Sequence, residues 1–251
     1  MTWRVGIRRM VAAGAGWFYR SARRIGVVTS ASRQEALQGS RSLPETPHEV
    51  VAGSGAGSPL RVVLLGNGPA ESPGAASGAA GFPAHLAQAI AARTRRRVEV
   101  KTLLGAGWDL PTLEKQLQDE KLHWQDALVV TAAYRPQLAE IPLGHWAAYT
   151  ESLRATLVRA AGPEPVIRVL SLPWQDAARD APLHWGGLFG NRVRAVAEIA
   201  EATLTPDQQA LPLRLHGPVM SKEWIGPAFS GQTYLRWADQ VAAELCTAWG
   251  L

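Results

Sequence analysis

Five short apolar runs, separated by longer stretches of helical pattern, constrain the fold of this chain more than any other feature. The runs are rich in Val and Leu and span residues 61–66, 98–104, 127–133, 166–172 and 211–216. Continuous apolar runs of this length are typical of strands that are covered on both faces. The stretches between them carry apolar residues at helical spacing, as in Trp146, Tyr149 and Leu153. Five alternations of strand and helix predict a five-stranded parallel sheet with helices on both faces.

Composition divides the chain into three segments. Residues 60–251 carry the alternating pattern and are expected to form one α/β domain. Residues 29–59 are rich in Ser, Gly, Pro and Ala and keep neither a strand nor a helix period, which favours a flexible linker. Residues 1–28 form a basic arm that precedes the linker.

The basic arm, residues 1–28, places apolar side chains roughly along one face of a helix and arginines on the other. A transmembrane span needs about 20 apolar residues without charges, and the uncharged stretch here runs only from Met10 to Tyr19. A secretory signal is a poor match, because arginines follow the apolar stretch. We expect an amphipathic helix on an anionic membrane surface, with the protein peripheral on the cytoplasmic face. An arm that packs on the body and an Arg-rich transit peptide both stay open.

The positive charge of the chain is concentrated near its N-terminus. The formal net charge is +5, and residues 1–60 hold eight arginines but only three acidic residues, so the remainder is neutral. A neutral body with a basic arm argues against a nucleic acid partner.

The first loop after a predicted strand begins Gly66-Asn67-Gly68 and must be tested as a dinucleotide site. In parallel sheets, ligands bind at the carboxyl ends of the strands, so this loop is well placed. The dinucleotide fingerprint needs a third glycine where this chain has Glu71, and Pro69 breaks the tight turn. A carboxylate there would repel pyrophosphate, and no cofactor is expected.

The order and spacing of the loops resemble those of the SGNH (GDSL-type) hydrolases, a family of esterases, lipases and acyltransferases, over about residues 60–249. The resemblance rests on Leu-Leu-Gly closing the first strand and on a glycine-containing second loop. It also rests on Ser171-Leu172-Pro173 after the fourth strand and on the closing segment FSGQTYLRWADQVAAEL. It implies a flavodoxin-like three-layer sandwich over residues 60–251.

The resemblance also implies that the catalytic groups of the family are replaced in this chain. The family's Gly-Asp-Ser falls at Gly66-Asn67-Gly68 in this chain. Its two oxyanion donors, a glycine and an Asn, fall at Gly107 and Arg135. Its Asp-x-x-His falls at Ile225 and Ala228. Acyl transfer needs a nucleophile and a base within hydrogen-bond reach. Neither Gly68 nor Ala228 supplies one, and losing that unit typically removes a factor of about a million from the rate.

A rebuilt site is the alternative. Ser72 lies four residues after Gly68 and is the first candidate for a relocated nucleophile. His184 and His216 are candidate bases, although His216 closes an apolar run and fits a hydrogen-bonded edge residue better. Asp109 or Glu71 would orient a histidine. A serine in a Pro/Gly turn is more commonly a turn residue.

Metal chemistry finds no support in the sequence. No two histidines or acids have metal-ligand spacing on one helix. The single Cys246 excludes a disulfide within the chain and a multi-cysteine metal site, and its helical surroundings favour a small packed thiol.

Aromatic side chains occupy the loops where polar catalytic groups would be expected. They are Trp108, Trp174, Trp185 and Trp224, joined by Tyr134 and Arg135. Such residues would line a pocket for an acyl chain or a sugar ring; ordinary packing into the vacated site is the other interpretation. The expected binding residues are Asn67, Gly68, Gly107, Trp108, Tyr134, Arg135, Trp185 and Trp224.

Three functions remain at this stage. The first is a non-catalytic protein that binds an acyl, lipid or sugar ligand or a partner protein. The second is an esterase or acyltransferase rebuilt around Ser72. The third is a scaffold that holds an enzyme at the membrane.

Overall fold

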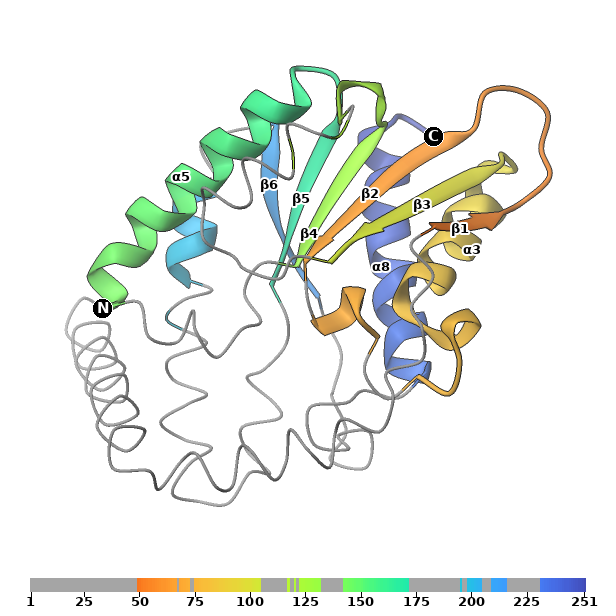
Figure 1. The fold of residues 1–251 in the computed structure, drawn as a ribbon, viewed down its shortest axis with the longest axis horizontal. Coiled ribbons are helices and arrows are strands. Elements are labelled where there is room, and N and C mark those ends of the chain that lie inside the picture. Colours follow the sequence, from red (N-terminus) through yellow and green to blue (C-terminus); the bar gives the residue numbers. More distant parts are fainter. Residues whose placement is uncertain are drawn as a thin grey trace.

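The structure of the chain, a computed structural model, is an α/β sandwich built on one six-stranded sheet (Figure 1). It describes residues 49–66, 68–72, 75–104, 117, 120, 122–131, 142–171, 195, 198–204, 209–215 and 231–251. The basic arm, residues 1–28, lies outside the described residues. Among those that are described, no helix combines the length and apolar character needed to cross a bilayer.

Six strands form the sheet. They are β1 (Glu49–Ala52), β2 (Leu60–Gly66), β3 (Val98–Leu103), β4 (Ala127–Thr131), β5 (Val166–Ser171) and β6 (Ala210–Arg214). Their order is β1-β3-β2-β4-β5-β6, and every neighbouring pair is parallel except β1 with β3. Counted from β2, the five parallel strands have the order 2-1-3-4-5 of flavodoxin-like sheets. The predicted fold class is confirmed.

The sheet has one strand more than the sequence predicts. β1 lies within residues 29–59, for which the composition predicts a flexible linker. Its four residues pair antiparallel with β3, with Ala52 opposite Val98. A run of four residues is too short to show a period of two, and it is stabilised by pairing with its neighbour rather than by its own pattern.

The burial of the strands explains why their sequences read as continuous apolar runs. β4 is buried at every position, and β2 at every position except Arg61. Both strands lie in the middle of the sheet, where helices cover both faces. β6 is only partly buried and contains Pro212, which has no N–H to donate and is tolerated because β6 is an edge strand.

Helices cover both faces of the sheet (Figure 1). α3 (Phe82–Thr94) and α8 (Gly231–Ala248) pack on one face in a core with Leu64, Val100 and Val129. α5 (Leu143–Ala161) packs on the other face in a second core, where Trp146, Leu153 and Leu157 meet Val63, Val130 and Ile167. Three short 3-10 helices, η1 (Gly68–Ala70), η2 (Gly78–Ala80) and η3 (Leu122–Trp124), lie in the connections.

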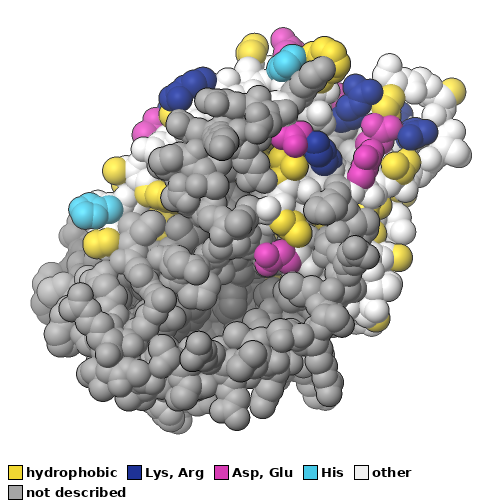
Figure 2. Space-filling view, viewed as in Figure 1, with side chains coloured by type: hydrophobic (Ala, Val, Ile, Leu, Met, Phe, Trp, Pro, Cys, Tyr) yellow, Lys and Arg dark blue, Asp and Glu magenta, His cyan; other side chains and the backbone are white. Residues whose placement is uncertain are grey.

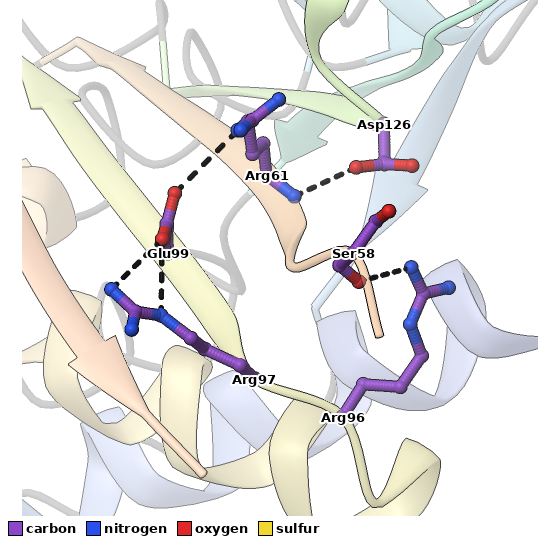
Figure 3. Close-up of polar contacts among 6 residues, drawn as sticks. All are labelled: Ser58, Arg61, Arg96, Arg97, Glu99 and Asp126. Carbon is purple, nitrogen blue, oxygen red and sulfur yellow. Dashed lines mark hydrogen bonds and ion pairs between the residues drawn. The ribbon is translucent and has the colours of Figure 1, made fainter. Parts of the chain in front are cut away.

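Charged side chains gather near the amino ends of the strands. On the face drawn in Figure 2, the Lys and Arg side chains lie in the upper part, among Asp and Glu, where Figure 1 places these ends. Asp126, which lies just before β4, connects several of these strand ends (Figure 3). Its Oδ2 accepts the Arg61 N–H at 2.7 Å, and its carbonyl accepts the Val166 N–H at 3.1 Å and the Trp249 Nε1–H at 3.2 Å. The residue fixes three strands and the end of α8 at this edge.

Cys246 on α8 is a buried free thiol, as the sequence predicts. Burial raises its pKa above the ordinary value of 9.0, although the Arg93 charge acts in the opposite direction. The unfolded chain therefore loses this proton at lower pH than the folded chain, so the thiol favours unfolding as the pH rises above about 9.

We expect a thiol reagent to modify Cys246 slowly in the native protein and rapidly in urea. We also expect Cys246→Ala to reduce the loss of stability above pH 9; native modification as fast as in urea would contradict this account.

Candidate functional site

The point at which the strand order reverses lies between β2 and β4. The chain passes from β2 to β3 on one side of β2 and then crosses to β4 on the other side. Connections that leave in opposite directions open a crevice at the carboxyl ends of these two strands, which is where ligands bind in open α/β sheets. Gly66, the last residue of β2, is paired there with Thr131, the last residue of β4.

The end of β2 is shaped by Gly66. Its φ of 127° lies in the region that side-chain-bearing residues rarely adopt, so glycine allows the chain to leave the strand abruptly. The neighbouring Thr131 is 1% exposed, and its Oγ1 donates a hydrogen bond to the Leu65 carbonyl at 3.1 Å. This bond joins the ends of β2 and β4 at the crevice.

Gly68 begins η1 directly after this turn. The resemblance places the family's nucleophilic serine at this position. Glycine has only a hydrogen as side chain, so this position carries no nucleophilic atom.

Ser72, the candidate for a relocated nucleophile, is 2% exposed. Its Oγ donates to the Pro69 carbonyl at 3.0 Å and accepts the Phe82 N–H at 2.9 Å. Its backbone N–H bonds to the Pro69 carbonyl at 3.1 Å, and its own carbonyl accepts the Ala75 N–H at 3.1 Å. The hydroxyl therefore satisfies an orphan donor at the start of α3, in the manner of a helix cap supplied from a distant turn.

The backbone of Ser72 is unusual as well. Its φ of 53° is left-handed, a conformation that costs free energy for a residue with a Cβ. A hydroxyl that donates and accepts at once, on a backbone held in this conformation, is typical of a residue that fixes a turn. A nucleophile, by contrast, needs a free lone pair facing substrate and a base within reach.

The remaining sequence-predicted site residues lie outside the described part of the chain. They are Asn67, Gly107, Trp108, Asp109, Tyr134, Arg135, Trp174, His184, Trp185, His216, Trp224, Ile225 and Ala228. Of the predicted set, the structure places Gly66, Gly68, Glu71 and Ser72, at the end of β2 and in the connection that follows it.

Four polar atoms near the carboxyl ends of the strands belong to residues that the sequence did not predict as site residues. Thr102 Oγ1 and Ser171 Oγ lie near the ends of β3 and β5, and His85 Nδ1 and Trp146 Nε1 lie in the first turns of α3 and α5. All four are buried without a hydrogen-bond partner among the described residues. Buried polar atoms rarely stay unpaired, so these are available to the loops of this edge or to a bound molecule. A single hydroxyl within an apolar strand has no sequence pattern that would mark it as a site residue.

Within the described ranges, no group of three or more His, Cys, Asp or Glu residues could hold a metal ion.

Solved structures share this architecture. They include a provisionally assigned GDSL-like lipase from Bacteroides ovatus, at a TM-score of 0.56 and 14% identity. They also include the salicylyl-acyltransferase SsfX3 from a tetracycline biosynthetic pathway, at 0.53 and 15%. A third is Est24, a carbohydrate acetylesterase from Sinorhizobium meliloti, at 0.52 and 13%. No family model matches the sequence, and no curated protein matches it.

The three structures differ in how much of their length is shared. The matches cover 78% of this chain for the first two structures and 75% for Est24. They span 56% of the lipase-like and acyltransferase chains, but 99% of Est24. At such low identity the likeness establishes the fold, which is that of the SGNH/GDSL-type hydrolases.

Proposed function

We propose that this chain, which has the fold of the GDSL-type hydrolases, is a non-catalytic protein that binds a small acyl, lipid or sugar ligand at the carboxyl ends of β2 and β4. One observation carries the proposal: the turn after β2, where the resemblance puts the nucleophile, is Gly66-Asn67-Gly68. Glycine has no group to form an acyl-enzyme. The resemblance puts Ala228 where the histidine base would be and Ile225 where its orienting acid would be. Fold alone does not imply activity.

The surroundings of Ser72 support the same conclusion. Esterase or acyltransferase chemistry by this serine is the second candidate function, because the solved structures with this fold include an acetylesterase and an acyltransferase. It would require the Oγ to give up its bond to the Phe82 N–H and to leave a 2% exposed position. Both changes carry a cost in free energy, which makes Ser72 a better structural residue than a nucleophile.

The ligand class follows from what the site offers. The sequence puts Trp108, Tyr134, Arg135, Trp185 and Trp224 in segments that follow predicted strands, and we infer that they line the site with the turn at Gly68. Flat aromatic surfaces beside one guanidinium suit an acyl chain or a sugar ring that carries an ester or hydroxyl group. The basic arm would hold the domain at the cytoplasmic face of an anionic membrane, where acylated molecules concentrate.

Titration of the tryptophan fluorescence with octanoate, methyl octanoate and glucose pentaacetate tests the binding function. We expect at least one probe to bind, and Trp185→Ala or Arg135→Ala to raise its Kd about tenfold, because a truncated hot-spot residue costs about 1–2 kcal/mol. Trp124→Ala is the matched control, since Trp124 lies before β4 at the opposite edge and is 60% exposed. Equal Kd values for Trp185→Ala and Trp124→Ala would contradict the proposed site.

A further inference from the structure

Three consecutive arginines, Arg95, Arg96 and Arg97, end α3 and precede β3. Arg95 is exposed and has a φ of 55°, the left-handed conformation in which a helix commonly ends. Glycine is the usual residue there, because any Cβ raises the energy of this backbone. An arginine at such a position costs stability, so its side chain is a candidate for a role outside folding.

The backbone of this triplet packs closely against the loop between β1 and β2. A Cβ added to Gly55 would lie 2.0 Å from the Arg95 carbonyl oxygen, and one added to Gly53 would lie 2.5 Å from that of Arg96. Arg96 Nη2 also donates to the Ser58 carbonyl at 2.6 Å (Figure 3). The backbone that carries the three side chains is thus in contact with a second segment of the domain.

Positive charge is in excess at this corner (Figure 3). Glu99 is shared by two arginines, with Arg61 Nε at 3.5 Å and Arg97 Nη2 at 3.1 Å. Arg96 donates to a neutral carbonyl, and Arg95 has no carboxylate partner among the described residues. The other nearby acid is Asp126, whose Oδ2 accepts the Arg61 N–H. Among the described residues of this corner, four arginines (Arg61, Arg95, Arg96 and Arg97) thus stand against two carboxylates.

The triplet lies next to β1, the first described segment of the chain. Ala52, the last residue of β1, is paired with Val98, which directly follows Arg97. The 48 residues before β1 contain eight arginines and two acidic residues. Val51 of the same strand is 49% exposed. An exposed apolar side chain and an arginine cluster thus share the corner at which the described part of the chain begins.

We propose that the Arg95–Arg97 triplet is a second contact with an anionic lipid surface, which acts together with the arm and orients the domain on the membrane. The inference rests on the proposed membrane role of the arm. Guanidinium groups attract phosphate headgroups and serine carboxylates, and each basic residue close to an anionic bilayer contributes about fivefold in partitioning. Val51 and Arg95 are both exposed at this corner, which suits contact with a surface better than binding of an enclosed ligand.

Co-sedimentation of the full-length chain with vesicles tests the inference. The vesicles are phosphatidylcholine alone or phosphatidylcholine with phosphatidylserine. We expect Arg95→Gly to weaken binding to the anionic vesicles about fivefold, and Arg95→Gln with Arg97→Gln to weaken it about 25-fold. Arg154→Gln, whose arginine is paired with Glu151 on α5, is the matched control and should leave binding unchanged. The thermal midpoint of unfolding distinguishes a membrane-binding role of Arg95 from a structural one. Arg95→Gly should raise this midpoint, because glycine adopts the left-handed backbone without strain.

Three outcomes would overturn the inference. The first is unchanged vesicle binding of the Arg95 variants, and the second is an equal loss on vesicles without phosphatidylserine. The third is a lowered thermal midpoint of Arg95→Gly with normal binding, which would make Arg95 a structural cap. Arg8→Gln with Arg9→Gln, in the full chain, separates this inference from the arm. If only that variant loses binding, the arm alone contacts the membrane. If the unsubstituted chain does not bind, both the membrane role of the arm and the contact by Arg95–Arg97 are wrong.

Discussion

Replacing Trp237 with Ala is expected to lower the free energy of unfolding by about 3–5 kcal/mol, measured by urea denaturation. Trp237 is 2% exposed and packs in the core beneath α8. Its ring meets Tyr234 edge-on at 6.3 Å, and Tyr234 meets Phe82 of α3 at 6.5 Å. The three rings join the two helices on one face of the sheet, so truncation leaves a large cavity and removes an aromatic contact.

Leu235→Ala provides the control on the same helix. Leu235 is adjacent in sequence but 51% exposed, and its truncation should change stability by less than about 0.5 kcal/mol. If Trp237→Ala proved as mild as Leu235→Ala, the core of α8 would not pack as described.

Gly81→Ala is expected to lower the free energy of unfolding by about 3 kcal/mol, because the added methyl group would overpack the turn that leads into α3. The added Cβ would lie 2.6 Å from Ser72 Oγ and 2.9 Å from Ser72 Cβ. Ser72 cannot move aside freely, since its hydroxyl is bonded to Pro69 and Phe82 and it is buried. The φ of Gly81 is −84°, so the cost is steric and not a matter of backbone preference.

A double-mutant cycle isolates this contact. Ser72→Gly removes both clashing atoms and fits the left-handed φ, but it loses the bond to the Phe82 N–H, for a net cost of about 1 kcal/mol. In that background Gly81→Ala should cost less than about 1 kcal/mol, which gives a coupling of about 2 kcal/mol. Additive effects would show that Ser72 does not hold this turn.

The sequence allowed the sheet to be predicted because its strands are buried on both faces. A continuous apolar run such as β4 requires cover on both sides, and the alternation with helices then determines a parallel sheet. β1 was missed because four residues carry no period and its partner lies in a distant segment. Pairing of that kind is a tertiary effect that no local pattern records.

The turn after β2 could be predicted from the sequence, but the contacts of its side chains could not. Gly66 and Gly68 end a strand pattern, which is enough to put them at the carboxyl end of β2. The role of Ser72 was not readable, because its hydrogen-bond partner Phe82 lies ten residues away at the start of a helix. In sequence, a turn serine and a helix-capping serine look alike.

Labelling with a serine-reactive fluorophosphonate, together with hydrolysis of p-nitrophenyl acetate, tests most directly whether this hydrolase fold has lost its chemistry. We expect no labelling of the unsubstituted chain or of Ser72→Ala, and hydrolysis no faster than in buffer, while an active GDSL-type esterase labels under the same conditions. Labelling of the unsubstituted chain that disappears in Ser72→Ala would contradict the account and make the protein an esterase with a relocated nucleophile.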